Sequence, residues 1–159
     1  MLEMAIYGVS FDMVGKTPIV LLKTVSGNRF LPIWIGHPEA ASILMRLQGA
    51  SAPRPGTHDL FMNTLSELGS GISRITITEL RENTFFAEIQ LDDASETILD
   101  ARPSDAIALA VRAEAPIFAA SAVVEEHGIE FEQDKLEDRE SMVEEFRSFL
   151  EDVTPDDFG

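Results

Sequence analysis

The chain has 159 residues, of which 45% are hydrophobic, and a formal charge of −16. This length and apolar fraction predict one compact domain with its own core. The charge argues against a general nucleic-acid binder, because nonspecific affinity comes largely from Lys and Arg that neutralise phosphates. The absence of cysteine excludes disulfides, thiolate zinc sites and cysteine nucleophiles.

The charge is spread unevenly along the chain. Residues 125–159 contain 14 acidic and 3 basic residues, whereas residues 1–124 contain 14 acidic and 9 basic residues. We therefore predict a domain at 1–125 and an acidic, partly helical tail at 126–159. We interpret the tail as a solvated segment. The alternatives are a helix that docks a protein partner and an internal mimic of nucleic acid that covers an anion site.

The sequence shows no signal for a membrane or for secretion. No run of about 18 apolar residues occurs, and the first residues show neither a basic region nor a small-residue cleavage site. We therefore expect a soluble cytoplasmic protein with no membrane association.

Extended segments alternate with turn residues in two parts of the chain. Pro32 indicates an edge position or a strand end for the third run. Strict alternation places Glu79 on the same face as the apolar Ile75 and Ile77, so either a bulge turns Glu79 outward or a carboxylate lies near the core. Strands are predicted at 3–12, 17–25, 30–36, 72–92 (a hairpin that turns near Glu82 and Asn83) and 95–100.

Four segments have helical periodicity. Pro38 fits a first helical turn, Gly49 and Gly69 fit helix ends, and Thr57 and Ser104 fit N-cap positions. Helices are predicted at 37–49, 57–69, 103–115 and 121–128, the third being apolar nearly all round and therefore buried. Together with the strands they predict an α+β fold, a mixed and largely antiparallel sheet with packed helices, followed by the acidic helical tail.

Two helix starts share an Arg-Pro pattern, "RPGTHD" and "RPSD". Their carboxylates, Asp59 and Asp105, suit the first turn of a helix, but Arg54 and Arg102 do not, because the helix dipole disfavours positive charge there. One interpretation is structural: each Arg pairs with its Asp. The other is an anion site, in which the guanidinium and free backbone N–H groups bind a phosphate or carboxylate. Two such sites could hold successive phosphates only if the helix starts converge.

Few other residues suggest chemistry. His58 lies at a helix start, where acid or base catalysis is sterically possible, although a histidine without a catalytic role fits the same position. Oxygen ligands for Mg²⁺ or Mn²⁺ could come from carboxylates outside the tail, but none occur at a recognised metal-ligand spacing. These carboxylates are Glu39, Asp59, Glu79 and Asp105.

Four motifs in order resemble the bifunctional nuclease family, whose members carry a DNase-RNase domain. The motifs are "FLPIWIGHPEAASI", "RPGTHDL", "ITITELRENTFFAEIQL" and "ARPSDAIALAVRAEAPIF". The resemblance covers residues 1 to about 125. It implies an α+β fold that forms homo-oligomers and a nuclease that hydrolyses phosphodiester bonds of DNA and RNA, with a divalent metal, Mg or Mn.

The resemblance carries over to particular positions. The catalytic candidates are His58, Asp59, Asp105 and Glu79, the phosphate-binding candidates are Arg54, Arg102, Ser104 and Arg81, and the metal candidates are Glu39, Asp59 and Asp105. As hypotheses, the two Arg-Pro arginines hold phosphate, Asp59 and Asp105 hold metal or orient water, and His58 acts as acid or base. The competing interpretation is a non-enzymatic oligomeric module that binds a small anion or a protein partner.

Overall fold

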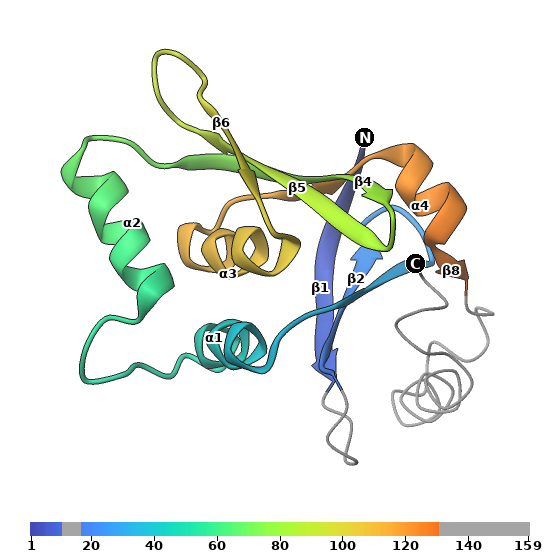
Figure 1. Cartoon of the computed structure of the whole chain (residues 1–159), viewed down its shortest axis with the longest axis horizontal. Coiled ribbons are helices and arrows are strands. Elements are labelled where there is room, and N and C mark those ends of the chain that lie inside the picture. Colours follow the sequence, from blue (N-terminus) through green and yellow to red (C-terminus); the bar gives the residue numbers. More distant parts are fainter. Residues whose placement is uncertain (11–16, 131–159) are drawn as a thin grey trace.

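The structure is a computed structural model, and it describes residues 1–10 and 17–130. These residues form one sheet with helices packed around it, which confirms the predicted α+β fold (Figure 1). The strands are β1 (Leu2–Ser10), β2 (Ile19–Thr24), β3 (Arg29–Trp34), β4 (Ile72–Arg81), β5 (Thr84–Leu91), β6 (Ile98–Ala101), β7 (Ile117–Ala119) and β8 (Ile129–Glu130). The helices are α1 (His37–Leu47), α2 (Thr57–Glu67), α3 (Pro103–Ala113) and α4 (Ser121–His127). The amphipathic stretch expected in the tail lies outside the described residues.

The sheet has the strand order β6-β5-β4-β7-β1-β2-β3-β8. Every neighbouring pair is antiparallel except β4 and β7, which confirms a mixed, largely antiparallel sheet. Pro32 faces Leu21 of β2 on one side, and β8 pairs only with Arg29 and Phe30 of β3. Pro32 therefore sits where β3 is an edge strand, as its missing N–H requires.

The β4–β5 hairpin shows how local chemistry sets the register. Its turn residues Glu82 and Asn83 have φ of 48° and 66°, the left-handed conformation that a tight two-residue hairpin turn needs. The register of β4 shifts between Ile77 and Glu79, and the Glu79 side chain is 50% exposed. A bulge therefore turns this carboxylate away from the core, which decides between the two predicted alternatives.

Helix ends follow the predicted proline and glycine signals. Pro38 lies in the first turn of α1, where its missing N–H costs no hydrogen bond. Gly49 and Gly69 follow the ends of α1 and α2 with φ of 67° and 73°, a conformation that glycine adopts without a steric penalty.

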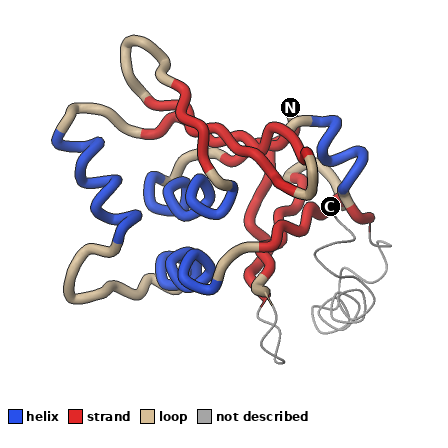
Figure 2. The backbone as a smooth tube through the Cα atoms, viewed as in Figure 1, coloured by secondary structure: helices blue, strands red, loops and turns tan. Residues whose placement is uncertain are grey.

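Helix α3 is the centre of the helical layer. It packs on β4 and β5, while α1 and α2 pack on α3, and α4 lies at the opposite end of the molecule (Figure 2). Its middle, from Ala106 to Ala110, is buried, and full burial of a side chain such as Ile107 contributes about 1.5–3 kcal/mol. This packing fixes the position of the polar residues at both ends of α3. Among the described helices, none has the length and apolar character needed to cross a membrane.

Candidate active site

Helix α3 carries charged residues at both ends of one face. Arg102 is its N-cap residue, Asp105 lies in the first turn and Arg112 in the last. Asp105 and Arg112 are seven residues apart, which is close to two turns, so they project from the same side of the helix. The carboxylate at the start and the guanidinium at the end also suit the helix dipole.

The start of α2 differs from the prediction. Thr57 is the first helical residue and Gly56 is the N-cap, while the backbone N–H of Gly56 donates to Oδ2 of Asp59 at 2.8 Å. In α3 the N-cap is Arg102, and Ser104 is buried within the first turn. The predictions that Thr57 and Ser104 cap their helices are therefore wrong. The N-cap of α2 lies one residue before Thr57, and the N-cap of α3 lies two residues before Ser104.

His58 lies between a hydroxyl and a carboxylate. Its Nδ1 is 2.8 Å from Oγ of Ser42 on α1, and its Nε2 is 2.9 Å from Oδ1 of Asp105 on α3. The side chain of His58 is 14% exposed. The starts of α2 and α3 therefore meet at this imidazole, which is the convergence that the Arg-Pro pattern left open.

Arg102 joins Asp105 to α1. Its Nε and Nη2 donate to the two carboxylate oxygens of Asp105 at 2.7 Å and 3.2 Å, and Nη2 also donates to Oε1 of Glu39 at 2.9 Å. These hydrogen bonds, the one to Asp105 first, raise the pKa of Arg102. The side chain is 66% exposed, and its Nη1 makes no hydrogen bond to the residues that the structure describes. One edge of this guanidinium can therefore receive an anion from solvent.

Arg112 is the buried counterpart of Arg102, with a side chain that is 11% exposed. Its Nε donates to Oδ1 of Asp59 at 2.7 Å, its Nη1 to the carbonyl of Ala108 at 2.8 Å, and its Nη2 to Oγ of Ser42 at 3.0 Å. It thus ties α3 to both α1 and α2. We call the whole assembly the interhelical polar network: Glu39, Ser42, His58, Asp59, Arg102, Asp105 and Arg112.

The two aspartates of the network have lowered pKa values for related reasons. The hydrogen bond from Arg112, followed by that from the Gly56 N–H, lowers the pKa of Asp59 below its ordinary value of 3.8. Burial alone works to raise the pKa of Asp105, but hydrogen bonds from Arg102 and His58 outweigh it and keep the pKa below 3.8. Both carboxylates are therefore ionised at neutral pH.

The lowered pKa of Asp59 predicts acid-dependent stability. A carboxyl group with a depressed folded-state pKa stabilises the protein fully above its unfolded-state pKa, and this contribution is lost as the pH falls through the folded-state value. The Asp59→Asn variant is expected to lose stability relative to wild type at pH 7 and to approach it at pH 3. Urea unfolding at both pH values measures this. Asp100→Asn, on an exposed residue of β6, is the control and should change stability little at either pH.

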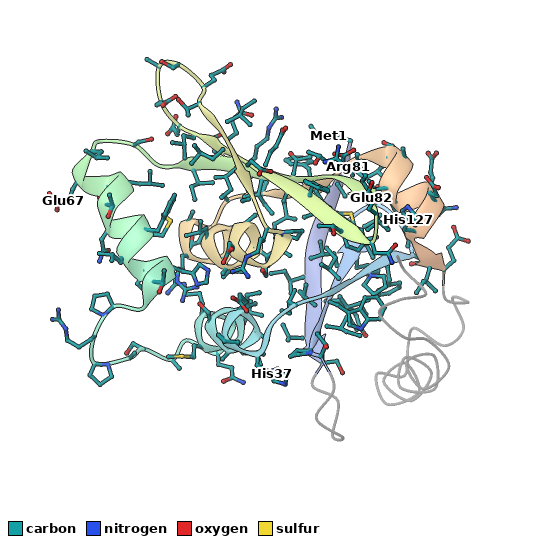
Figure 3. All side chains as sticks on the ribbon, in the orientation of Figure 1. Met1, His37, Glu67, Arg81, Glu82 and His127 are labelled. Carbon is teal, nitrogen blue, oxygen red and sulfur yellow. The ribbon has the colours of Figure 1, made fainter. Side chains whose placement is uncertain are left out.

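Four predicted site residues are not members of the network, and one of them, Ser104, is buried in the first turn of α3. Arg54 is exposed in the loop before α2 and makes no hydrogen bond or ion pair with the described residues. Glu79 and Arg81 pair with each other at 3.7 Å near the tip of the β4–β5 hairpin. Figure 3 shows Arg81 close to the α4 end of the molecule, whereas Glu67 marks α2 on the other side. The structure brings together Glu39, His58, Asp59, Arg102 and Asp105 from the predicted set.

The predicted metal ligands do not fit a shared metal ion. Glu39 and Asp105 both accept hydrogen bonds from Arg102, and Asp59 accepts from Arg112 and Gly56. No group of three or more His, Asp or Glu side chains in residues 1–10 and 17–130 is placed to hold a metal. The guanidinium group of Arg102 lies between Glu39 and Asp105, the position that a divalent cation shared by these two carboxylates would take.

Ser42 and Arg112 are the members of the network that sequence reasoning missed. Ser42 follows Glu39 by three residues on α1, so both lie on one helix face. Arg112 is the basic residue of an otherwise apolar helix, seven positions after Asp105. That spacing is a usable signal, because a charged side chain in a buried helix needs a partner.

Comparison with known proteins places the chain in a family. The bifunctional nuclease domain matches residues 20–132. A Mycobacterium tuberculosis protein described as uncharacterized is 38% identical over 161 residues, 98% of this chain and 97% of that protein. Bifunctional nuclease 1 of Oryza sativa subsp. japonica is 28% identical over 110 residues, 67% of this chain and 33% of the rice protein. Bifunctional nuclease 1 of Arabidopsis thaliana is 28% identical over 105 residues, 63% of this chain and 32% of that protein. Because the domain spans most of its length, the chain belongs to the bifunctional nuclease domain family.

Proposed function

We propose that this chain is a nuclease that hydrolyses phosphodiester bonds of DNA and RNA at the interhelical polar network. The observation that carries the proposal is the position of His58 between Ser42 and Asp105, the carboxylate that also accepts hydrogen bonds from the partly exposed Arg102. The names of the plant relatives support the reaction class. An imidazole aligned by a carboxylate is the usual device for moving a proton near neutral pH.

Each residue has a role that its contacts support. The free edge of Arg102 binds a non-bridging phosphate oxygen and stabilises the charge that develops during transfer. Asp105 accepts the Nε2 hydrogen of His58 and thereby fixes the orientation and tautomer of the ring. Glu39 holds Arg102 from the other side, at 2.9 Å from Nη2.

A requirement for Mg²⁺ or Mn²⁺ stays a prediction. A divalent cation would neutralise phosphate charge when bound, a contribution that matters here because three carboxylates face two guanidinium groups in the network. No step of the reaction is assigned to the cation, since the three carboxylates already accept hydrogen bonds from arginines. Assays with Mg²⁺, with Mn²⁺ and with a chelator test the requirement directly.

The experiment is a cleavage assay with an Arg102→Ala variant. Purified protein is incubated with single-stranded DNA, duplex DNA and RNA under the three metal conditions, and activity must comigrate with the protein on a sizing column. Arg102→Ala is expected to lower the rate about 100-fold, because a preorganised donor to the transition state is lost. The control is Arg46→Ala, whose side chain is 46% exposed near the end of α1 and which should keep wild-type activity.

Two results would contradict the proposal. Activity that persists in a folded Arg102→Ala variant would place the reaction elsewhere or reveal a contaminant. No cleavage under any condition would remove the nuclease function.

A non-enzymatic oligomeric module is the second candidate, and exposed apolar side chains favour it. Leu60 and Phe61 of α2 are 61% and 37% exposed, and Leu68 just after α2 is 76% exposed. Apolar surface of this kind is a common feature of sites where another protein surface binds. Light scattering on a sizing column measures the mass in solution. A stable oligomer that binds anions and cleaves no nucleic acid would support this candidate over the nuclease.

A further inference from the structure

We propose that Ser42 Oγ is the nucleophile of this site and that cleavage proceeds through a phosphoserine ester on α1. This inference rests on the proposed nuclease function and goes beyond it, because the sequence motifs assign no role to Ser42. The geometry is a hydroxyl, an imidazole and a carboxylate in series, contributed by α1, α2 and α3.

The imidazole of His58 has no free nitrogen. Both ring nitrogens of His58 already have partners, Ser42 at 2.8 Å and Asp105 at 2.9 Å. A water molecule could be deprotonated by His58 only if one of these hydrogen bonds broke. The hydroxyl that His58 can deprotonate without rearrangement is that of Ser42.

The hydrogen bonds of His58 run in a direction that suits a base beside Ser42. Asp105 is ionised and can only accept, so Nε2 of His58 carries the hydrogen in the neutral ring. Nδ1 is then an acceptor. Because Nη2 of Arg112 donates to Oγ of Ser42 at 3.0 Å, the serine hydroxyl is free to donate its own hydrogen to Nδ1. This is the arrangement of a serine nucleophile and its base, with the two ring nitrogens exchanged relative to the usual order.

A positive charge lies beside the Ser42 hydroxyl. The guanidinium of Arg112 contacts Oγ directly and is held by Asp59 at 2.7 Å and by the Ala108 carbonyl at 2.8 Å. A fixed positive charge at this distance stabilises negative charge on Oγ as its proton leaves.

The reaction divides into two balanced steps. In the first, Oγ of Ser42 bonds to phosphorus, the hydroxyl proton moves to Nδ1 of His58, and the leaving nucleoside oxygen, opposite Oγ, departs with its electron pair and takes a proton from solvent. In the second, water bonds to phosphorus and releases a proton to solvent, while the bond between phosphorus and Oγ breaks and Oγ recovers the proton from His58. One water is consumed, and the products are an alcohol and a phosphomonoester.

The stereochemistry at phosphorus tests this route in the wild-type protein. Two in-line displacements retain configuration, whereas direct attack by water inverts it. We expect retention when a phosphorothioate diester of defined configuration is cleaved in ¹⁸O-labelled water. Inversion would overturn the covalent route and leave the nuclease function intact.

A second test uses variants and a chemical probe. Ser42→Ala is expected to lower cleavage on the order of 10³-fold or more, whereas Ser66→Ala, on an exposed serine of α2, should have no effect. A fluorophosphonate is expected to label Ser42, as located by mass spectrometry, and labelling should fall at least tenfold in His58→Gln. Labelling of Ser42 in a protein that cleaves no nucleic acid would uphold the nucleophile and remove the nuclease function. An unlabelled Ser42 together with an active Ser42→Ala variant would overturn the inference.

Discussion

Replacing His58 with glutamine is expected to lower phosphodiester cleavage by about 10²–10⁴-fold, the range for loss of a general acid–base. Glutamine is polar and similar in length, but it cannot take up and return a proton. The matched control is His127→Gln on α4, whose imidazole is 25% exposed and lies at the other end of the molecule (Figure 3). Cleavage rates for both variants, measured from pH 5 to pH 9, provide the comparison.

The pH profile separates a chemical role of His58 from a structural one. A wild-type pH dependence that comes from proton transfer by His58 should be absent from the residual activity of His58→Gln. Thermal unfolding shows whether the variant remains folded. An unchanged pH profile in a folded variant would contradict the assignment of His58 as the base.

Replacing Arg112 with methionine is expected to destabilise the protein by about 2–3 kcal/mol. Methionine preserves much of the apolar volume, but the variant loses the ion pair with Asp59 and leaves Ser42 Oγ and the Ala108 carbonyl without this donor. Arg46→Met is the control, because Arg46 is 46% exposed and pairs at 3.8 Å with Glu114, which is 84% exposed. That exposed pair contributes less than about 0.5 kcal/mol.

A double-mutant cycle identifies the source of the loss. Urea unfolding of Arg112→Met, of Asp59→Asn and of the combined variant gives the coupling between the two side chains. If the ion pair forms, Asp59→Asn costs less in the Arg112→Met background than in wild type. Full additivity would show that Arg112 stabilises the helices through its other contacts alone.

The fold was predictable because local signals agreed with the tertiary structure. Pro38, Gly49 and Gly69 lie at helix boundaries where their backbone chemistry is favourable, and Glu82 and Asn83 form the expected turn. The family resemblance and the α+β class are confirmed by the domain match and by the sheet. The N-cap predictions for Thr57 and Ser104 are wrong, because the preference for hydroxyl side chains at this position does not indicate the actual N-caps. These are Gly56 and Arg102.

The candidate site was only partly predictable. His58, Asp59 and Asp105 stood out because helix starts have recognisable chemistry, and the structure brings them into one network. Ser42 lies within α1, where no local rule marks it, and Arg112 is marked only by its spacing from Asp105 in a buried helix. Their partners are set by the packing of α1 and α2 on α3, which is a tertiary property.

Helix α2 buries fewer residues than α3, and this difference affects how the site would be lost on heating. Helix α2 carries His58, but Leu65 is the one residue of this helix that is buried. Helix α3, in contrast, buries most of its length. Segments with few buried apolar contacts open with a smaller free energy than the core around them. Detachment of α2 would separate the imidazole from both Ser42 and Asp105 while the sheet and α3 stayed folded. We therefore expect heating to disrupt the proposed site by detaching this one helix before the whole domain melts.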